Sequence, residues 1–174
     1  MGHEQMQRAP RTIGNRLAIA GVPKGVWVLG FVSMLMDVSS EIIHSLLPVY
    51  LVTVMGASTL LVGLIEGVSE ASVALIKVLS GVISDRTGKR RQLVVLGYGL
   101  AALSKPAFPL AQSLDWLVAA RIVDRIGKGI RGAPRDALIS DLSPASARGA
   151  SYGLRQSLDT LGAVLGPVIA LLAM

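Results

Sequence analysis

Charged side chains recur inside stretches of this sequence that are otherwise apolar. Acids and a histidine at helical spacing can take up and release protons, and clustered arginines can bind carboxylate or phosphate groups. A charge at the centre of a bilayer costs about 2.5–3.5 kcal/mol, so such groups must face protein or a water-filled cavity. The charges concerned are Asp37, Glu41, His44, Glu66, Glu70, Lys77, Lys105, Arg121, Asp124, Arg125, Lys128, Arg131, Arg135, Asp136, Arg155 and Asp159.

The composition indicates a membrane protein. Of the 174 residues, 52% are hydrophobic and 16% are charged, whereas a soluble domain carries about 25% charged residues. The mean hydropathy is +0.60. A helix that crosses a bilayer needs roughly 20 apolar residues. Five stretches are long enough, so we expect an all-α chain that crosses the lipid bilayer five times, over residues of about 25–52, 60–84, 93–111, 116–139 and 150–174.

The basic residues outside these stretches indicate how the chain is oriented. They gather in the tail 1–24 and the loop 85–91, with Arg148 in the last loop, whereas the gaps 53–59 and 112–115 have none. Lys and Arg accumulate in cytoplasmic loops, which predicts a multi-pass protein of the cytoplasmic (inner) membrane with its N-terminus in the cytoplasm. The net charge of +6 is thereby explained as topology, and the hydropathy excludes a soluble nucleic-acid-binding protein.

Helical phase places the charges of each span on one face. At about 100° per residue, the three charges of the first span fall within an arc of ~60°, those of the second within ~40° and those of the fourth within ~140°. The stripes are either structural ion pairs or the walls of a solute pathway, and as a set we favour the pathway. For Lys105, Arg155 and Asp159, near span ends, a structural or interfacial role has more weight. A fourth span lying on the membrane surface is disfavoured by the short loops beside it.

Residues 81–91 read GVISDRTGKRR, a polar segment directly after an apolar stretch. A glycine at its start allows close helix packing, and a second glycine permits a turn. The segment fits G-x-x-x-D-[RK]-x-G-[RK]-[RK], and it resembles the loop 2–3 signature of the major facilitator superfamily. In that family the loop acts as a conformational latch between the two halves of a transporter. The resemblance implies a gating role for Gly81, Asp85, Arg86, Gly88, Lys89 and Arg90.

Two further motifs resemble the same family. The segment RIGKGIRGAP is similar to R-x-x-Q-G-x-G-A-A, in which the Arg, here Arg125, is associated with proton coupling in proton-driven exporters. Lys128 replaces the usual Gln and Arg131 a small residue, so this cavity is expected to be more basic than the pattern and unsuited to a simple lipophilic cation. The last span resembles the antiporter signature G-x8-G-x3-G-P-x2-G, with Ala170 at the final position and matches at Gly153, Gly162, Gly166 and Pro167.

The resemblance implies a major facilitator-type helix bundle with five of an expected twelve spans. The sequence stops at Met174 within an apolar stretch, so we expect a cytoplasmic tail (1–24) and an incomplete N-terminal bundle (25–174), completed by a C-terminal half. Such a bundle would export a small polar or charged solute against protons by alternating access. The candidates for proton coupling are Asp37, Glu41, Glu66, Glu70 and Arg125, and those for substrate binding are Arg121, Lys128 and Arg131.

Other functions are less well supported by the sequence. Uptake or symport of an organic anion agrees with the basic fourth span but not with the glycines of the fifth. A non-transporting membrane sensor would be expected to lose the charged stripes. The chain has no cysteine, and it contains no nucleophile elbow, phosphate-binding loop or metal-ligand spacing. We therefore predict neither an enzyme nor a cofactor or metal site.

Overall fold

The computed structural model describes residues 21–174, so most of the expected tail, residues 1–24, lies outside the described residues. The predicted all-α architecture is confirmed. Four of the expected spans coincide with helices of 25 to 30 residues, and the third coincides with a shorter helix. The elements are α2 (Lys24–Thr53), α3 (Thr59–Thr87), α4 (Arg90–Ser104), the 3₁₀ turn η1 (Lys105–Ala107), α5 (Leu114–Leu142) and α6 (Arg148–Leu172).

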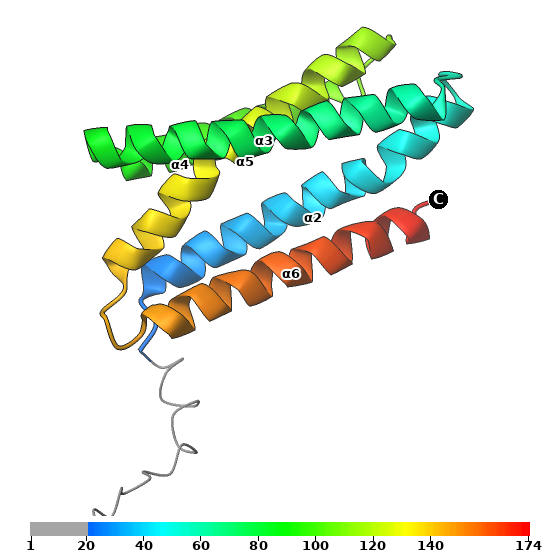
Figure 1. The fold of residues 1–174 in the computed structure, drawn as a ribbon. Helices are drawn as coiled ribbons and strands as arrows, with labels where there is room; N and C mark the ends of the chain where they lie inside the picture. Colours follow the sequence, from blue (N-terminus) through cyan, green and yellow to red (C-terminus); the bar gives the residue numbers. More distant parts are fainter. Residues whose placement is uncertain (1–20) are drawn as a thin grey trace, which may run out of the picture.

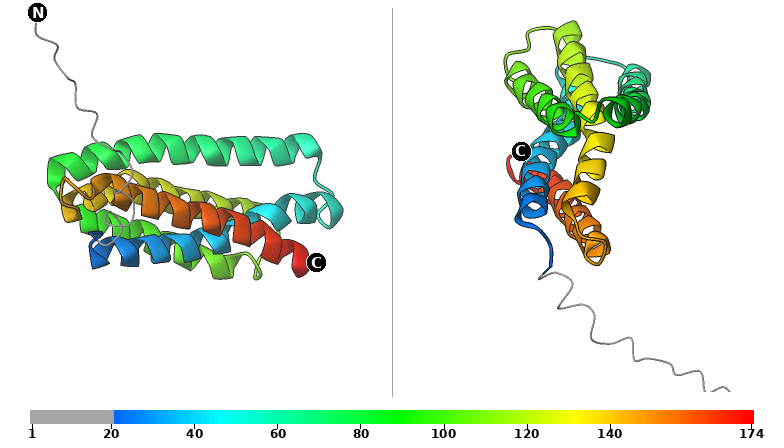
Figure 2. Two further views of the ribbon diagram at one scale, coloured as in Figure 1. Left: turned by 90° about the horizontal axis from the view of Figure 1, so that it is seen from below. Right: turned by 90° about the vertical axis from the view of Figure 1, so that its left-hand side faces the viewer.

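The helices form two packed groups. Helices α2 and α6 lie side by side, and α5 packs against both α3 and α4. Helices α2, α4 and α6 run in one direction and α3 and α5 in the other (Figure 1). In the end-on view in Figure 2 the α2–α6 pair lies apart from α3 and α4, and the last part of α5 reaches across to the start of α6. The 85–91 loop and the loop before α6 consequently lie at the same end as the start of α2, as the distribution of basic residues predicts.

Two of the described helices, α2 and α3, could cross a membrane by length and apolar composition alone. The count of five spans, and of twelve in a complete protein, therefore stays a prediction. Helix α4 has 15 residues and is shorter than the expected stretch 93–111. Helix α4 ends where η1 begins, and the second residue of η1 is Pro106. The α-helix ends here because proline lacks the N–H that would continue it.

Small residues bring the helix backbones of the second group into contact. A Cβ added at Gly127 of α5 would lie 2.7 Å from the Gly97 carbonyl oxygen of α4. One added at Gly129 would lie 2.8 Å from the Ile76 Cβ of α3. Glycine at these positions is therefore what lets α5 sit closely between its neighbours, where its charged side chains are shielded from lipid.

The α2–α6 contact also depends on glycine. A Cβ at Gly162 would lie 2.7 Å from the Met34 carbonyl oxygen, and one at Gly166 would lie 2.5 Å from the Glu41 Cβ. Within the described residues, and apart from the local backbone of α6 itself, no heavy atom lies within 4 Å of the position a Cβ would take at Gly153. Pro167 lies inside α6 next to this contact. Of the glycines in the antiporter-like signature, Gly162 and Gly166 therefore have the predicted packing role.

Candidate functional site

Helix α5 carries a column of buried charges. The side chains of Arg121, Asp124, Arg125, Arg131 and Arg135 all belong to residues that are at most 6% exposed. At 1.5 Å per residue, the column extends over about 21 Å of the helix. Buried charges must be paired or hydrogen-bonded, so their partners on neighbouring helices define the interior of the bundle.

The first layer of the column joins three helices. Arg121 Nη2 donates a hydrogen bond to Glu66 Oε2 of α3 at 2.6 Å and also contacts His44 Nδ1 of α2. His44 Nδ1 lies 3.3 Å from the same carboxylate oxygen. The predicted proton-coupling residue Glu66 and the predicted substrate-binding residue Arg121 are therefore ion-pair partners of each other.

The second layer contains two ion pairs that join α5 to other elements. Arg125 Nη1 lies 3.0 Å from Glu70 Oε1, which belongs to a half-exposed side chain. Lys105 Nζ donates hydrogen bonds to Asp124 Oδ1 at 2.8 Å and to Ser40 Oγ at 2.7 Å. Of the structural and interfacial roles expected for Lys105, this pairing favours the structural one: its side chain turns inward and supplies the countercharge of the buried Asp124 carboxylate.

The third layer is centred on Arg131. Its Nη2 lies 3.5 Å from Asp37 Oδ1 of α2. Its guanidinium carbon lies 4.7 Å from the centroid of the Tyr98 ring of α4, a cation–π contact. Arg131 therefore bridges the two helix groups, with its carboxylate partner on one side and an aromatic face on the other.

The fourth layer is a cluster of two bases and two acids. Arg135 Nη2 lies 3.3 Å from Asp159 Oδ2, and Arg155 Nη2 lies 2.8 Å from the same oxygen. Both bases also approach Asp136 Oδ1, each at 3.7 Å. Arg135 further donates a hydrogen bond to Ser33 Oγ. Arg155 and Asp159 therefore take part in the interior charge network, which is the structural one of the two roles expected for them.

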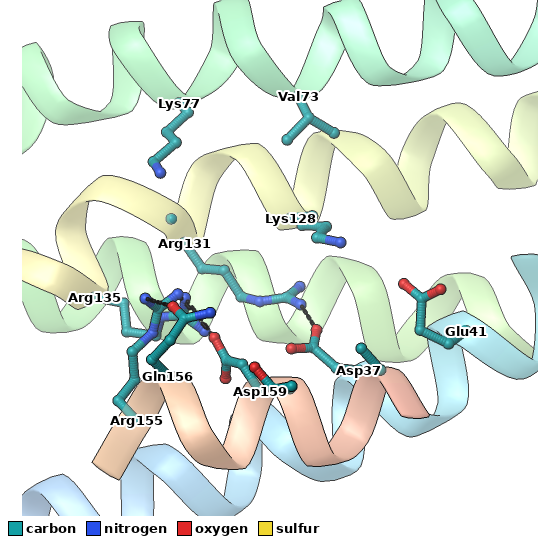
Figure 3. A pocket seen from close by; sticks show the side chains of 13 residues that line it. Asp37, Glu41, Val73, Lys77, Lys128, Arg131, Arg135, Arg155, Gln156 and Asp159 are labelled. Carbon is teal, nitrogen blue, oxygen red and sulfur yellow. Dashed lines mark hydrogen bonds and ion pairs between the residues drawn. The ribbon is translucent and has the colours of Figure 1, made fainter. Parts of the chain in front are cut away.

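A cavity of about 330 Å³ opens beside the third and fourth layers (Figure 3). In Figure 3 the lysines and Arg131 enter it from α3 and α5, whereas the three acids enter it from α2 and α6. Its position near the middle of all four helices agrees with where transporters bind their solutes. The lining residues are Asp37, Glu41, Val73, Lys77, Lys128, Arg131, Gly132, Arg135, Arg155, Gln156, Asp159, Thr160 and Ala163.

Four of the eight residues predicted for proton coupling and substrate binding line the cavity, and one of these, Arg131, also belongs to the column. Asp37, Glu41, Lys128 and Arg131 line the cavity. The other four, which lie nearer the opposite end of α5, do not line it and form ion pairs instead: Glu66 with Arg121, and Glu70 with Arg125.

Sequence reasoning did not assign four of the charged residues that line the cavity to a site. Lys77 shares a helical face with Glu66 and Glu70, and Arg155 and Asp159 stand at i, i+4 spacing on α6. Those spacings are signals of a polar face, but they carry no information on which faces meet. Arg135, Lys77, Arg155 and Asp159 are added to the candidate site by the structure.

The loop motif forms a second, smaller site at the end of the bundle. Arg90 donates a hydrogen bond to the Asp141 carboxylate of α5, and its Nη2 lies 3.5 Å from Asp85 Oδ1. Gly88 has a φ of +66°, which favours glycine. Gly81 faces Ala133, whose Cβ would be 3.2 Å from an added Cβ. Asp141, which lies outside the motif, is therefore part of this loop site.

The remaining bases of the loop point to solvent. Arg86 and Lys89 are exposed, and neither makes an ion pair within residues 21–174. The same part of the chain holds no group of three or more metal-ligating residues.

Comparison with known proteins gives consistent results. The sequence model of the family described as "Major Facilitator Superfamily" matches residues 29–174. The chain is similar to the "Uncharacterized MFS-type transporter MJ1317" of Methanocaldococcus jannaschii, with 42% identity over 149 residues, 86% of this chain and 37% of the relative. It is 29% identical over 156 residues to the "Inner membrane transport protein YajR" of Escherichia coli, which covers 86% of this chain and 33% of the relative.

A third relative has a name that refers to drug resistance. The chain is 28% identical over 145 residues to the "Multidrug resistance protein MdtH" of Photorhabdus laumondii, which covers 83% of this chain and 36% of the relative. The chain spans about a third of the length of these curated relatives.

Proposed function

The chain belongs to the major facilitator superfamily, and on that premise we propose that it forms the N-terminal part of a proton-coupled exporter. Membership makes the protein an integral membrane transporter rather than an enzyme. The solute would be small and polar or charged, and it would cross by alternating access. The remaining, C-terminal half would supply the other wall of the pathway, and the lipid bilayer would surround both.

The charged cavity is the observation that carries this proposal. It is lined by four helices near their middles and contains three acids and five bases. A protein that needed charges only for stability would gain little from leaving them around an open space, because buried ion pairs roughly offset their own desolvation. A cavity with adaptable charged walls instead suits a solute that enters and leaves.

Asp37 is the residue we assign to proton handling. It lines the cavity and holds Arg131 at 3.5 Å. Protonation of the Asp37 carboxylate would remove the negative charge that holds Arg131. Proton binding would thereby change how available the Arg131 guanidinium is to the solute. Glu41 lines the same cavity one helical turn away and is the second candidate. Glu66 and Glu70 are tied to buried arginines and would act through the column.

The loop site would control the exchange between the two conformations of the alternating-access cycle. Arg90 links the α3–α4 loop to the end of α5 through Asp141 and Asp85. A contact between exposed charges is weak and can be broken and remade. We place the transporter in the cytoplasmic membrane. This end of the bundle would face the cytoplasm, because its loops are basic.

Uptake or symport of an organic anion is the second candidate. Lys77 and Lys128 favour it, because within residues 21–174 neither makes an ion pair. The name of one relative, a multidrug resistance protein, favours export.

Proton movement in inverted membrane vesicles separates the two candidates. Vesicles that contain the full-length protein are given an acidic lumen, and organic anions, zwitterions and cations are added outside in turn. Antiport predicts that one class raises the pH of the lumen, whereas symport predicts that solute and protons enter together. Vesicles without the protein are the control. No proton movement with any class, while the protein is folded, would contradict the proposal.

A further inference from the structure

We propose that the cavity binds the acidic group of an organic anion between Lys77 and Lys128. The inference rests on the proposed transport function and names the class of solute. It replaces Arg121, which sequence reasoning placed in the substrate site, by a lysine of α3. Three observations support it: the balance of charge around the cavity, the placement of the two lysines and the surroundings of Lys77.

Most charges around the cavity neutralise one another. Arg131 pairs with Asp37, which leaves no net charge. The fourth layer combines Arg135 and Arg155 with two carboxylates and is also neutral. What remains is Lys77, Lys128 and Glu41, and within residues 21–174 none of the three makes an ion pair. The cavity therefore has one positive charge in excess, and two unpaired ammonium groups.

The two lysines approach the cavity from adjacent helices. Lys77 extends from α3 and Lys128 from α5, whereas Glu41 extends from α2 on the opposite wall (Figure 3). An ammonium group is a compact charge on a flexible stem, so the pair can close around a carboxylate or phosphate group of varied geometry. Walls of low dielectric constant strengthen the attraction and raise the local concentration of anions.

Gly132 helps to position Lys77. A Cβ at Gly132 would lie 3.2 Å from both Cγ and Cδ of Lys77 and 3.4 Å from Cε. The lysine stem therefore lies along the bare backbone of α5 at this point, in the wall of the cavity. A cationic solute would meet two unpaired ammonium groups here, and it would have a single unpaired carboxylate, Glu41, to bind.

A thiol placed in the cavity measures its charge preference without knowledge of the natural solute. The lining residue Thr160 is exposed and lies on α6, and residues 1–174 contain no cysteine. Thr160→Cys is introduced into the full-length protein, free of other cysteines, in membranes. Its rates of modification by anionic sulfonatoethyl and cationic trimethylammonioethyl methanethiosulfonate are compared, and their ratio is divided by that for a small thiol in solution.

The proposal predicts a normalised anion-to-cation ratio of about 10 or more. The combined change Lys77→Gln and Lys128→Gln leaves the Glu41 carboxylate as the unpaired charge and should lower the ratio to 1 or below, whereas Lys77→Arg with Lys128→Arg should preserve it. Lys24→Gln, which removes an exposed lysine outside the cavity, should leave it unchanged.

A normalised ratio of 1 or below, or a high ratio that the double glutamine change leaves intact, would overturn the proposal. The first of these outcomes is measured with both lysines present, so it stands even where the double variant fails to fold. Because the readout needs no transport, it is independent of the vesicle experiment. Cation-triggered proton movement with a ratio below 1 would refute the anion site and leave the transport function standing.

Discussion

Arg121 of α5 and Glu66 of α3 form an ion pair of 2.6 Å in which the arginine side chain is completely buried. Both residues come from the polar stripes in which a solute pathway was expected. Their pairing means that this part of the stripes holds α3 against α5 and does not line the cavity. The charged interior therefore has two parts, an ion-pair cluster around Arg121 and the cavity that Asp37 lines, which is the candidate transport site.

Removal of the Glu66 carboxylate should destabilise the protein strongly. Glu66→Ala leaves the buried Arg121 with His44 as its remaining neighbour, and an uncompensated buried charge costs about 3–5 kcal/mol. The free energy of unfolding in detergent micelles measures the loss. Glu66→Leu combined with Arg121→Met should be less harmful than Glu66→Ala. Asp115→Asn, at an exposed carboxylate, is the control, with a loss below about 1 kcal/mol. Equal stability of Glu66→Ala and Asp115→Asn would contradict the structural role.

The glycines of α6 should differ sharply in their tolerance of a methyl group. Gly166→Ala places a Cβ 2.5 Å from the Glu41 Cβ and 2.9 Å from the Val38 carbonyl oxygen. The resulting separation of α6 from α2 should cost about 1–3 kcal/mol. Gly153→Ala lies on the same helix, where no described atom beyond the local helix backbone would be within 4 Å of the new Cβ. It should instead be neutral or stabilise by up to about 1 kcal/mol. Melting temperatures of the two variants test this, and a reversed order would disprove the packing.

Two adjacent arginines in the loop should have different effects on transport. Arg90 contacts Asp141 and Asp85, whereas Arg91 is exposed and makes no ion pair within the described residues. Arg90→Gln should slow transport several-fold with little change in melting temperature, because exposed ion pairs contribute little to stability. Arg91→Gln removes the same charge and should transport at the wild-type rate. Initial transport rates in vesicles distinguish them; equal rates would exclude a specific gate at Arg90.

The helices could be predicted from the sequence because hydropathy and helical phase are local properties. Helix α4 ends before the expected third span does, because Pro106 of η1 lacks the N–H that would continue the α-helix. The small residues of the last span correctly indicated a packing face at Gly162 and Gly166. The absence of a neighbour at Gly153 could not be predicted, because it depends on where the partner helix passes.

The candidate site was predictable in composition but not in arrangement. The stripe of α5 contains both Arg121 and Lys128, and helical phase does not distinguish them. Their environments differ because the neighbouring helices present Glu66 at one height and open space at another. The inward turn of Lys105 likewise follows from Asp124 on a different helix. Pairing across helices needs their relative rotation and height, which a single sequence does not contain.

The most direct test of the transport account is Asp37→Asn in the vesicle experiment, measured with the solute class that moves protons in the wild type. Asparagine keeps the shape of the side chain and cannot bind the transported proton. We predict that solute-triggered proton movement is lost in Asp37→Asn and retained in Asp115→Asn, which neutralises an exposed carboxylate away from the cavity. Undiminished proton movement in Asp37→Asn would contradict proton coupling at this cavity.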